Sequence, residues 1–149
     1  MKVTGQTNFA SPPEQVWEAL LDPGIISDCI PGCQEMTEVE TDRYAAVLKI
    51  GLGPVSGLYR GTLTIRDKEP PMRYVMVFEG SGKQGFVRGA GATQLHGENG
   101  ATVVSYDCDV EVGGVIASVG QRVLEGVSKF MVNQMFTELR KRVDRGDGQ

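Results

Sequence analysis

The sequence predicts an α+β fold in which a curved antiparallel sheet wraps around one long C-terminal helix. Segments between residues 34 and 112 alternate apolar and polar side chains, and turn-forming stretches separate them. Glycines recur inside these segments, at 51–61 and 80–91, where a glycine in a strand marks a bend or a close approach. The last third of the chain carries apolar residues at the three-and-four spacing of a helix, roughly from Ile116 to Val143.

The first thirty residues predict one strand followed by two short helices. Residues 2–9 alternate and read as a strand. Ser11, with Glu14 three residues later, has the spacing of a capping box, and the intervening prolines suit a first helical turn. Trp17 belongs to the apolar face of this helix and is expected to anchor it on the sheet. A second short helix is expected over residues 23–29.

Six further strands complete a predicted seven-stranded sheet. Their expected bounds are Gln34–Glu40, Arg43–Ile50, Val55–Asp67, Arg73–Gly80, Gly85–His96 and Ala101–Val112. Asn99-Gly100 is a favoured hairpin pair, because both residues tolerate positive φ. One face of these strands is apolar and the other polar, as in an antiparallel sheet that is solvated on one side.

Composition limits the classes of protein that fit. The 149 residues are expected to form a single domain over residues 1–143, followed by a frayed tail over 144–149. A net charge of −4 argues against a nucleic-acid surface, and no apolar run reaches the 18 residues of a membrane span. The three cysteines form no C-x-x-C pair, and no signal-peptide core is present. These features predict free thiols and a cytoplasmic location.

The sheet and the long helix are expected to pack closely at one end and to diverge at the other. The space between them at the second end is expected to be an apolar cavity that binds a small molecule. Inward-facing strand positions are the candidate ligand contacts: Leu48, Ile50, Tyr59, Leu63, Met76, Phe78, Val87 and Tyr106. The first half of the helix adds Ile116, Val119 and Val123, and Ile30 and Pro31 are expected at the rim. Ordinary core packing is the competing interpretation for every one of these positions. The two tyrosine hydroxyls are candidates to orient a polar headgroup.

The sequence offers little for catalysis, and we expect no enzyme activity, metal or cofactor. His96 is the sole histidine and stands beside a predicted turn, with no set of ligands around it. The inward positions hold tyrosines but no His, Asp or Glu that could transfer a proton. The glycine-rich loop 80–85 lacks the Ser or Thr and the following helix of a phosphate loop, and is expected to be a hairpin tip.

Four stretches of the sequence resemble known families. The order of elements and V-W-E-A-L-L-D-P at 16–23 resemble the START/polyketide-cyclase superfamily, SRPBCC, whose members have a helix-grip fold. C-I-P-G-C at 29–33, G-P-V-S-G-L-Y-R-G at 53–61 and V-G-G-V-I-A-S-V-G-Q-R at 112–122 are similar to a narrower family, the G subunits of carbon monoxide dehydrogenase. This second resemblance extends over nearly the whole chain.

The resemblance implies an accessory role. Such proteins accompany molybdenum hydroxylases of the carbon monoxide dehydrogenase type, connect them to the membrane, and have a cavity suited to a lipid or quinone-like molecule. A peripheral contact at the inner face of the membrane is therefore expected. The cationic turn at 140–142 would either touch anionic lipid or complement the helix dipole. Two alternatives stay open: a cyclase- or hydrolase-like enzyme of the superfamily, and a protein-interaction module without ligand.

Overall fold

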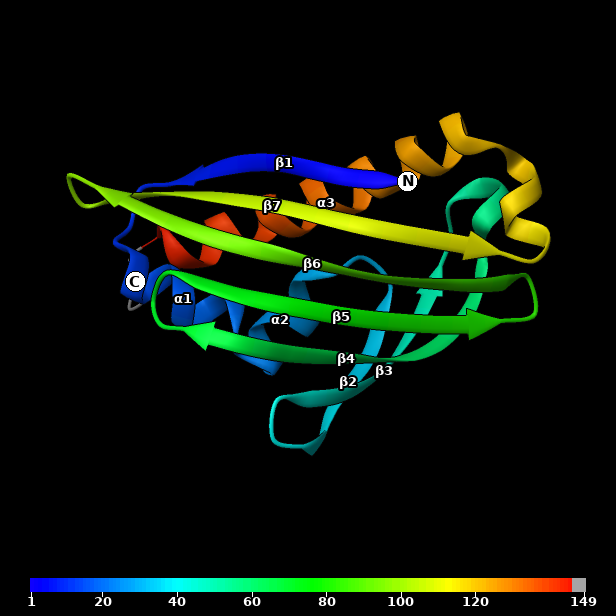
Figure 1. Ribbon diagram of the computed structural model, residues 1–149, viewed down its shortest axis with the longest axis horizontal. Coiled ribbons are helices and arrows are strands. Elements are labelled where there is room, and N and C mark those ends of the chain that lie inside the picture. Colours follow the sequence, from blue (N-terminus) through cyan, green and yellow to red (C-terminus); the bar gives the residue numbers. More distant parts are fainter. Residues whose placement is uncertain (146–149) are drawn as a thin grey trace.

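The computed structural model describes residues 1–145 and contains one seven-stranded antiparallel sheet with three α-helices. In spatial order the strands are β1-β7-β6-β5-β4-β3-β2. The elements in chain order are β1 (Lys2–Phe9), α1 (Pro13–Leu20), α2 (Pro23–Cys29), β2 (Cys33–Glu40), β3 (Arg43–Ile50), the 3₁₀ helix η1 (Gly53–Val55), β4 (Gly57–Glu69), β5 (Arg73–Gly82), β6 (Gly85–Glu98), β7 (Ala101–Gly113), the 3₁₀ helix η2 (Val115–Val119) and α3 (Gln121–Val143). The three α-helices lie on one face of the curved sheet, behind it in Figure 1, which confirms the predicted fold class.

Glycines allow the sheet to bend sharply across β4 to β7. A Cβ on Gly61 would overlap the backbone oxygen of Glu79 on the neighbouring strand. A Cβ on Gly89 would lie 2.7 Å from the carbonyl oxygen of Asp109 on β7 and 2.6 Å from the Phe78 ring. No side chain fits such spacings, so these glycines mark the close approaches that the sequence predicted.

The helices meet the sheet at one end, which we call the tight end. There Leu139 of α3 and Val16 of α1 have no exposed surface, and Phe9 and Val104 of the sheet pack in the same cluster. Trp17 packs edge-to-face on Tyr74, with ring centroids 5.6 Å apart, so it anchors α1 on β5 as expected.

The predicted capping box does not form at α1. Pro12 is the N-cap residue, and no side chain caps this helix. The Ser11 hydroxyl instead donates to the Asp144 carboxylate at 2.7 Å, and the backbone N–H of Ala10 donates to the same carboxylate at 2.8 Å. Asp144 is the first residue of the predicted tail; residues 146–149 of that tail lie outside the described part of the chain.

The predicted terminal helix is interrupted, because Gly120 adopts φ +98° between η2 and α3. That backbone conformation is rare for residues with a side chain and ends the 3₁₀ turn before the α-helix begins. The predicted strand from Val55 also starts later, since Val55 is buried in η1. The hairpin at Asn99-Gly100 is as predicted, with φ of 53° and 81°.

Candidate functional site

The strand register brings the eight predicted strand contacts onto one face of the sheet, the face that the helices cover. Directly paired residues of neighbouring antiparallel strands point to the same side. Leu63 pairs with the buried Tyr44 on one side and with Phe78 on the other. By the same register the inward set comprises Leu48, Ile50, Tyr59, Leu63, Met76, Phe78, Val87 and Tyr106.

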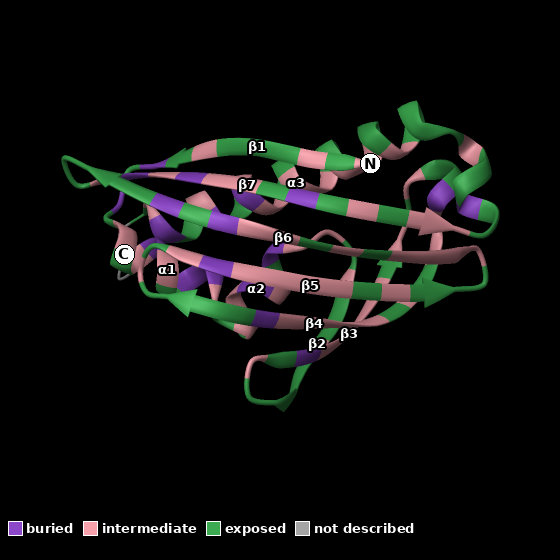
Figure 2. Cartoon of the chain, in the orientation of Figure 1, coloured by how far each residue is buried: buried purple, intermediate pink, exposed green. Residues whose placement is uncertain are grey.

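Burial of these inward side chains changes along each strand. At the tight end Tyr44, Ile65, Tyr74 and Val104 are buried, with at most 8 % of their surface exposed. All eight predicted contacts are half-buried. Leu63, Met76 and Tyr106 pack against the core cluster of the tight end, and the other five lie toward the opposite end, which we call the wide end. In Figure 2 the purple segments of β4, β5 and β6 lie toward the tight end and give way to pink and green, whereas β7 has a further purple segment near its middle. The inward Cys108 of β7 is 7 % exposed. Solvent therefore reaches the apolar inner face at the wide end.

The first half of α3 contributes less to this face than predicted. Val123 is 38 % exposed, and it precedes the fully buried Leu139 by 16 residues. At 3.6 residues per turn the two side chains lie about 160° apart around the helix, so Val123 points away from the core. The prediction that Val123 faces inward was wrong because it assumed one continuous stripe. α3 has no buried residue before Phe136.

η2 places the other two predicted helix contacts. Ile116 is 2 % exposed, and its N–H donates to the carbonyl oxygen of Gln84 at 2.8 Å, which ties η2 to the turn between β5 and β6. Val119 is half-buried. Ile116 thus packs as core on the hairpin tip, whereas Val119 keeps accessible surface.

Ile30 and Pro31 lie where α2 ends, and both are half-buried. The following Gly32 has φ +81°, and its carbonyl oxygen accepts the Lys49 N–H at 2.8 Å. A Cβ on Gly32 would lie 3.5 Å from the Ile50 side chain. This turn therefore holds the end of α2 beside the inward residues of β3.

The tyrosine hydroxyls differ in their partners. Tyr59 donates to the carbonyl oxygen of Val55 at 2.7 Å, so its hydroxyl holds η1 on β4. Tyr106 stacks on Phe136, with ring centroids 5.6 Å apart. Burial raises the pKa of both hydroxyls, so they are neutral donors at neutral pH.

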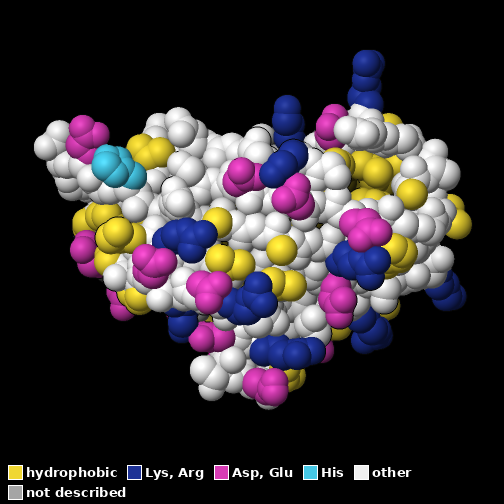
Figure 3. Space-filling view, in the orientation of Figure 1, with side chains coloured by type: hydrophobic (Ala, Val, Ile, Leu, Met, Phe, Trp, Pro, Cys, Tyr) yellow, Lys and Arg dark blue, Asp and Glu magenta, His cyan; other side chains and the backbone are white. Residues whose placement is uncertain are grey.

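Charged groups lie outside this face. The inward positions of β4 to β7, from Gly57 to Ile65, Tyr74 to Gly82, Val87 to Leu95 and Thr102 to Val112, hold no Asp, Glu, Lys, Arg or His. Figure 3 shows Lys, Arg, Asp and Glu side chains spread over the opposite, outer face. Within residues 1–145, no group of three or more His, Cys, Asp or Glu side chains is placed to hold a metal ion.

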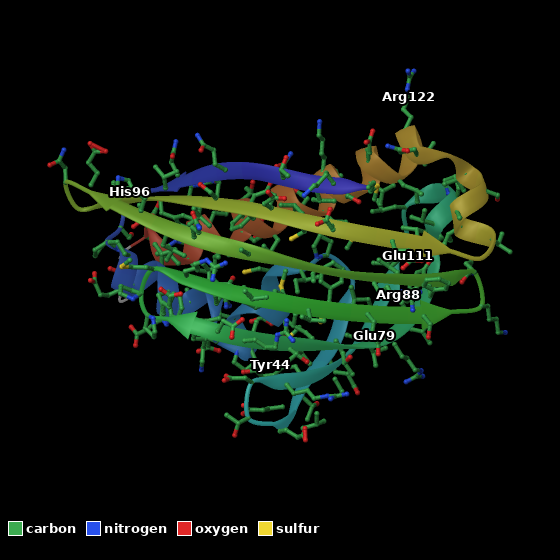
Figure 4. All side chains as sticks on the ribbon, in the orientation of Figure 1. Tyr44, Glu79, Arg88, His96, Glu111 and Arg122 are labelled. Carbon is green, nitrogen blue, oxygen red and sulfur yellow. The ribbon has the colours of Figure 1, made fainter. Side chains whose placement is uncertain are left out.

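The outer face holds one feature that the sequence analysis missed, a hollow of about 230 Å³. Its walls include Arg60, Glu79, Phe86 and Arg88, and the small residues Gly61 and Gly80 line it as well. The Arg88 side chain donates to Glu111 at 2.8 Å, and its guanidinium lies 5.0 Å from the centre of the Phe86 ring. Figure 4 shows Glu79, Arg88 and Glu111 together near the wide end, whereas His96 lies at the other end of the sheet.

A second hollow, open to solvent, lies at the tight end beside α2 and measures only about 20 Å³. Leu20, Ile26, Tyr44 and Ile65 are among its lining residues. Such a volume holds about one water molecule. The tight end is therefore filled by the protein's own side chains.

The cationic turn at 140–142, for which a lipid contact and a complement to the helix dipole were the two interpretations, makes interactions within the protein. Arg140 donates to the backbone oxygen of Asn8 at 2.9 Å, and its guanidinium lies over the Phe9 ring. Arg142 pairs with Asp28 at 3.1 Å, and Lys141 pairs with Glu138 within α3. Among the helices of residues 1–145, none is long and apolar enough to cross a membrane.

The free cysteines occupy separate places in the fold. Cys29 and Cys108 are buried, whereas Cys33 at the start of β2 is half-buried. Burial raises the pKa of all three thiols. They are therefore protonated at neutral pH and behave mainly as small apolar groups.

Comparison with known structures first defines the class. The chain has the START-like helix-grip fold: a START superfamily protein from Mycobacterium smegmatis matches with a TM-score of 0.74 at 10 % identity, covering 97 % of each chain. A protein from Thermus thermophilus also matches with a TM-score of 0.74, at 17 % identity over 96 % of this chain and 97 % of that one. At these identities the likeness shows the fold alone.

The family follows from the sequence. The family of carbon monoxide dehydrogenase G subunits (CoxG) matches residues 5–144, and the chain belongs to this family. A conserved protein from Geobacillus kaustophilus is 34 % identical over 97 % of this chain and 96 % of its own, with a TM-score of 0.95. None of the curated proteins compared matches the chain.

Proposed function

We propose that the protein binds an apolar small molecule, of lipid or quinone-like chemistry, against the inner face of the sheet at the wide end. One observation carries the proposal: apart from the buried Cys108, the inward apolar side chains of the strands are buried at the tight end and half-buried toward the wide end. When a ligand covers apolar surface that was in contact with water, the binding free energy becomes more favourable by about 25 cal/mol per Å². A ligand would thus bury the inward side chains that the chain itself leaves half-exposed.

The proposed ligand contacts follow from burial. Leu48, Ile50, Tyr59, Leu63, Met76, Phe78, Val87 and Tyr106 would contact it from the sheet, Val119 from η2, and Ile30 and Pro31 from the rim. Val123 and Ile116 are not part of this set, because one points outward and the other is already packed. The Tyr106 hydroxyl is the candidate donor to a ligand carbonyl.

The protein would act as a binding and recruiting factor and not as a catalyst. The absence of charged groups at the inward positions of β4 to β7 supports this, since proton transfer needs a positioned acid or base. Family membership supports a partner of the carbon monoxide dehydrogenase type, a molybdenum hydroxylase that the protein would help bring to the membrane. Residues 1–143 would do this as one folded unit.

Native mass spectrometry with organic extraction tests the proposal. The purified protein is expected to carry, or to take up from added quinone or fatty acid, one apolar molecule. Val87→Trp should abolish uptake: Val87 points inward opposite Gly80, which leaves room for the larger ring. Val123→Trp is the matched control, because the same change on the outward side of α3 should leave uptake intact.

Two outcomes would overturn the proposal. A protein that stays empty with every added quinone and fatty acid would favour an interaction module without ligand. Equal uptake by the Val87→Trp and Val123→Trp variants would place the ligand elsewhere. Turnover of an added ester or polyketide substrate would instead establish the enzyme alternative.

A further inference from the structure

The outer face of the sheet, opposite the three α-helices, has apolar side chains in its middle (Figure 3). Val75 and Val77 of β5 pair with Ala92 and Ala90 of β6, respectively. These residues point outward because they alternate along their strands with inward residues such as Tyr74. Ala90 is exposed and the other three are half-buried. We call these four residues the apolar centre, because the register brings them together and no helix of residues 1–145 covers them.

The two sides of the apolar centre differ in charge. One row of register partners crosses the centre from Arg66 on β4 to Asp107 on β7. The adjacent row crosses it from Arg43 on β3 to Asp109 on β7. The outward residues of β3, and those of β4 as far as Arg66, include no acid, and the outward residues of β7 include no cation. The outer face is therefore positive on its β3–β4 side and negative on its β7 side.

The charges on these two sides are only partly neutralised within the chain. Arg43 and Arg66 form no salt bridge within residues 1–145. On the negative side, Lys2 of β1 is shared between the carboxylates of Asp107 and Asp109, at 3.2 Å from each. The two aspartate side chains are 65 % and 78 % exposed. One lysine for two carboxylates leaves a negative charge in excess at this place.

A pair of opposite charges lies beside the apolar centre, toward the wide end. Glu79 of β5 and Arg88 of β6 are register partners, and Figure 4 shows both on this part of the sheet. Arg88 nevertheless makes its salt bridge with Glu111 of β7, at 2.8 Å, and Glu79 makes none within residues 1–145. Glu79 therefore presents a carboxylate that no salt bridge of the described chain engages.

The outer face is complementary to a second copy of itself about one particular two-fold axis. If the axis runs parallel to the strands, between β5 and β6, β5 of each copy lies over β6 of the other and β4 lies over β7. Arg66 of each copy then faces Asp107 of the other. Glu79 of each copy likewise faces Arg88 of the other. An axis across the strands would instead place the positive side of one copy on the positive side of the other, so the charges fit a second copy in one orientation.

We propose that the outer face binds a second copy of this chain, sheet against sheet, through the apolar centre and these two kinds of charge pair. The small side chains of the apolar centre allow the two sheets to approach each other. Arg66 lies one strand farther out, where its longer side chain spans the wider gap between two curved sheets. Burial of apolar surface drives association, and the charge pairs fix the orientation.

A second copy fits this face better than a partner of one charge does, because the face has cations on one side and acids on the other. The helices and the inner face of the sheet stay outside the contact. The inference therefore goes beyond the proposed ligand and does not depend on it.

Sedimentation velocity of the full chain, over a range of concentrations, tests this surface. We expect a reversible dimer whose dissociation constant rises with salt, since the charge pairs lie near the solvent. Ala90→Lys puts a charge into the apolar centre, opposite Val77 of the second copy, and should raise the dissociation constant at least about tenfold. Ala117→Lys is the matched control, because Ala117 is also exposed but lies in η2, away from the outer face.

A charge exchange tests the orientation. Arg66→Asp and Asp107→Arg each place like charges opposite one another, and each should raise the dissociation constant by about tenfold. The double variant should bring it back close to the wild-type value, because opposite charges again face each other. Lys129→Asp, the same change in net charge on an exposed part of α3, should leave it within about twofold. Circular dichroism checks that each variant is folded, and the charge exchange keeps the test decisive if Ala90→Lys is not.

The inference is wrong if the wild-type protein is a monomer at every concentration, if Ala90→Lys and Ala117→Lys dimerise equally, or if the double charge variant dimerises no better than the single ones. A monomer that binds a purified molybdenum hydroxylase, and loses this binding in Ala90→Lys, would assign the face to that enzyme instead. Ligand uptake by Ala90→Lys is expected to stay intact, and native mass spectrometry measures it separately. Failure of dimerisation and failure of ligand binding are therefore distinguishable.

Discussion

The two ends of the sheet share strands and share an apolar inner face, yet the protein's own side chains cover this face more fully at the tight end than at the wide end. On β4 the inward Ile65 is buried and Leu63 is half-buried; on β5 the inward Tyr74 is buried and Phe78 is half-buried. The difference comes from the covering layer, because α1, α2 and the last turns of α3 pack on the tight end. Equal hydrophobicity along a strand therefore does not imply equal burial.

Removing a large side chain from each end is the strongest test of this comparison. Leu139→Ala should lower the free energy of unfolding by about 2–5 kcal/mol, since Leu139 has no exposed surface and its loss leaves a cavity. Leu124→Ala, the same change in the half-buried first part of α3, should cost less than about 1 kcal/mol. Urea unfolding measures both. Equal losses would mean that the wide end is as tightly packed as the tight end.

Alkaline pH should destabilise the tight end through Tyr74. Burial raises the pKa of Tyr74 to about 12 from the ordinary value of 10, and it outweighs the opposite effect of the neighbouring Thr93 side chain. The folded state thus holds this proton more strongly than the unfolded state. The contribution of neutral Tyr74 to the free energy of unfolding is fully present below pH 10. It is lost between about pH 10 and pH 12, and amounts to roughly 2–3 kcal/mol. Stability measured from pH 9 to 11.5 should fall less steeply in Tyr74→Phe than in the wild type.

The hydroxyl of Ser11 should matter more than that of Ser118. Ser11→Ala removes the part-buried hydrogen bond from Ser11 to the Asp144 carboxylate and should cost about 1.5 kcal/mol. Ser118 donates to Val115 within exposed η2, so Ser118→Ala should cost less than about 0.5 kcal/mol. Thermal unfolding of the two variants gives the comparison. If the Ser11 variant is as stable as the wild type, the hydrogen bond between Ser11 and Asp144 does not stabilise the tight end.

The smallest expected effect is a gain in stability at the wide end. Gly126 lies within α3, and a Cβ there would meet nothing within 4 Å. Gly126→Ala should therefore raise the free energy of unfolding by about 0.5–1 kcal/mol through helix propensity alone. Gly100→Ala is the contrasting variant, because Gly100 has φ +81° and its substitution should destabilise the hairpin. A loss of stability in Gly126→Ala would contradict the open space that the structure leaves around Gly126.

Several parts of the fold were predictable because their causes are local. The segments that alternate apolar and polar residues predicted strands with bounds close to the observed ones, and Asn99-Gly100 predicted the hairpin between β6 and β7. The same alternation predicted which strand side chains point inward, since a strand has only two faces. Membership of the family of carbon monoxide dehydrogenase G subunits was recognisable from short stretches at Cys29–Cys33 and Gly53–Gly61.

Other features depended on contacts between distant residues. The spacing of Ser11 and Glu14 matches a capping box, but the partner of Ser11 is Asp144, 133 residues away. The apolar spacing in the last third of the chain suggested one helix, but the backbone at Gly120 divides it and Val123 points outward. The hollow on the outer face, between Arg60 and Arg88, arises where three bent strands lie together.

By itself the sequence determined the seven strands, their inward and outward faces and the helix that closes them, because periodicity and turn chemistry act over a few residues. Only the tertiary structure decided how far that helix covers the sheet. Burial depends on which elements meet in space, and Phe136, Leu139 and Val143 reach the core while the earlier turns of α3 do not. That physical difference left an apolar face half-covered at the wide end, where we place the ligand.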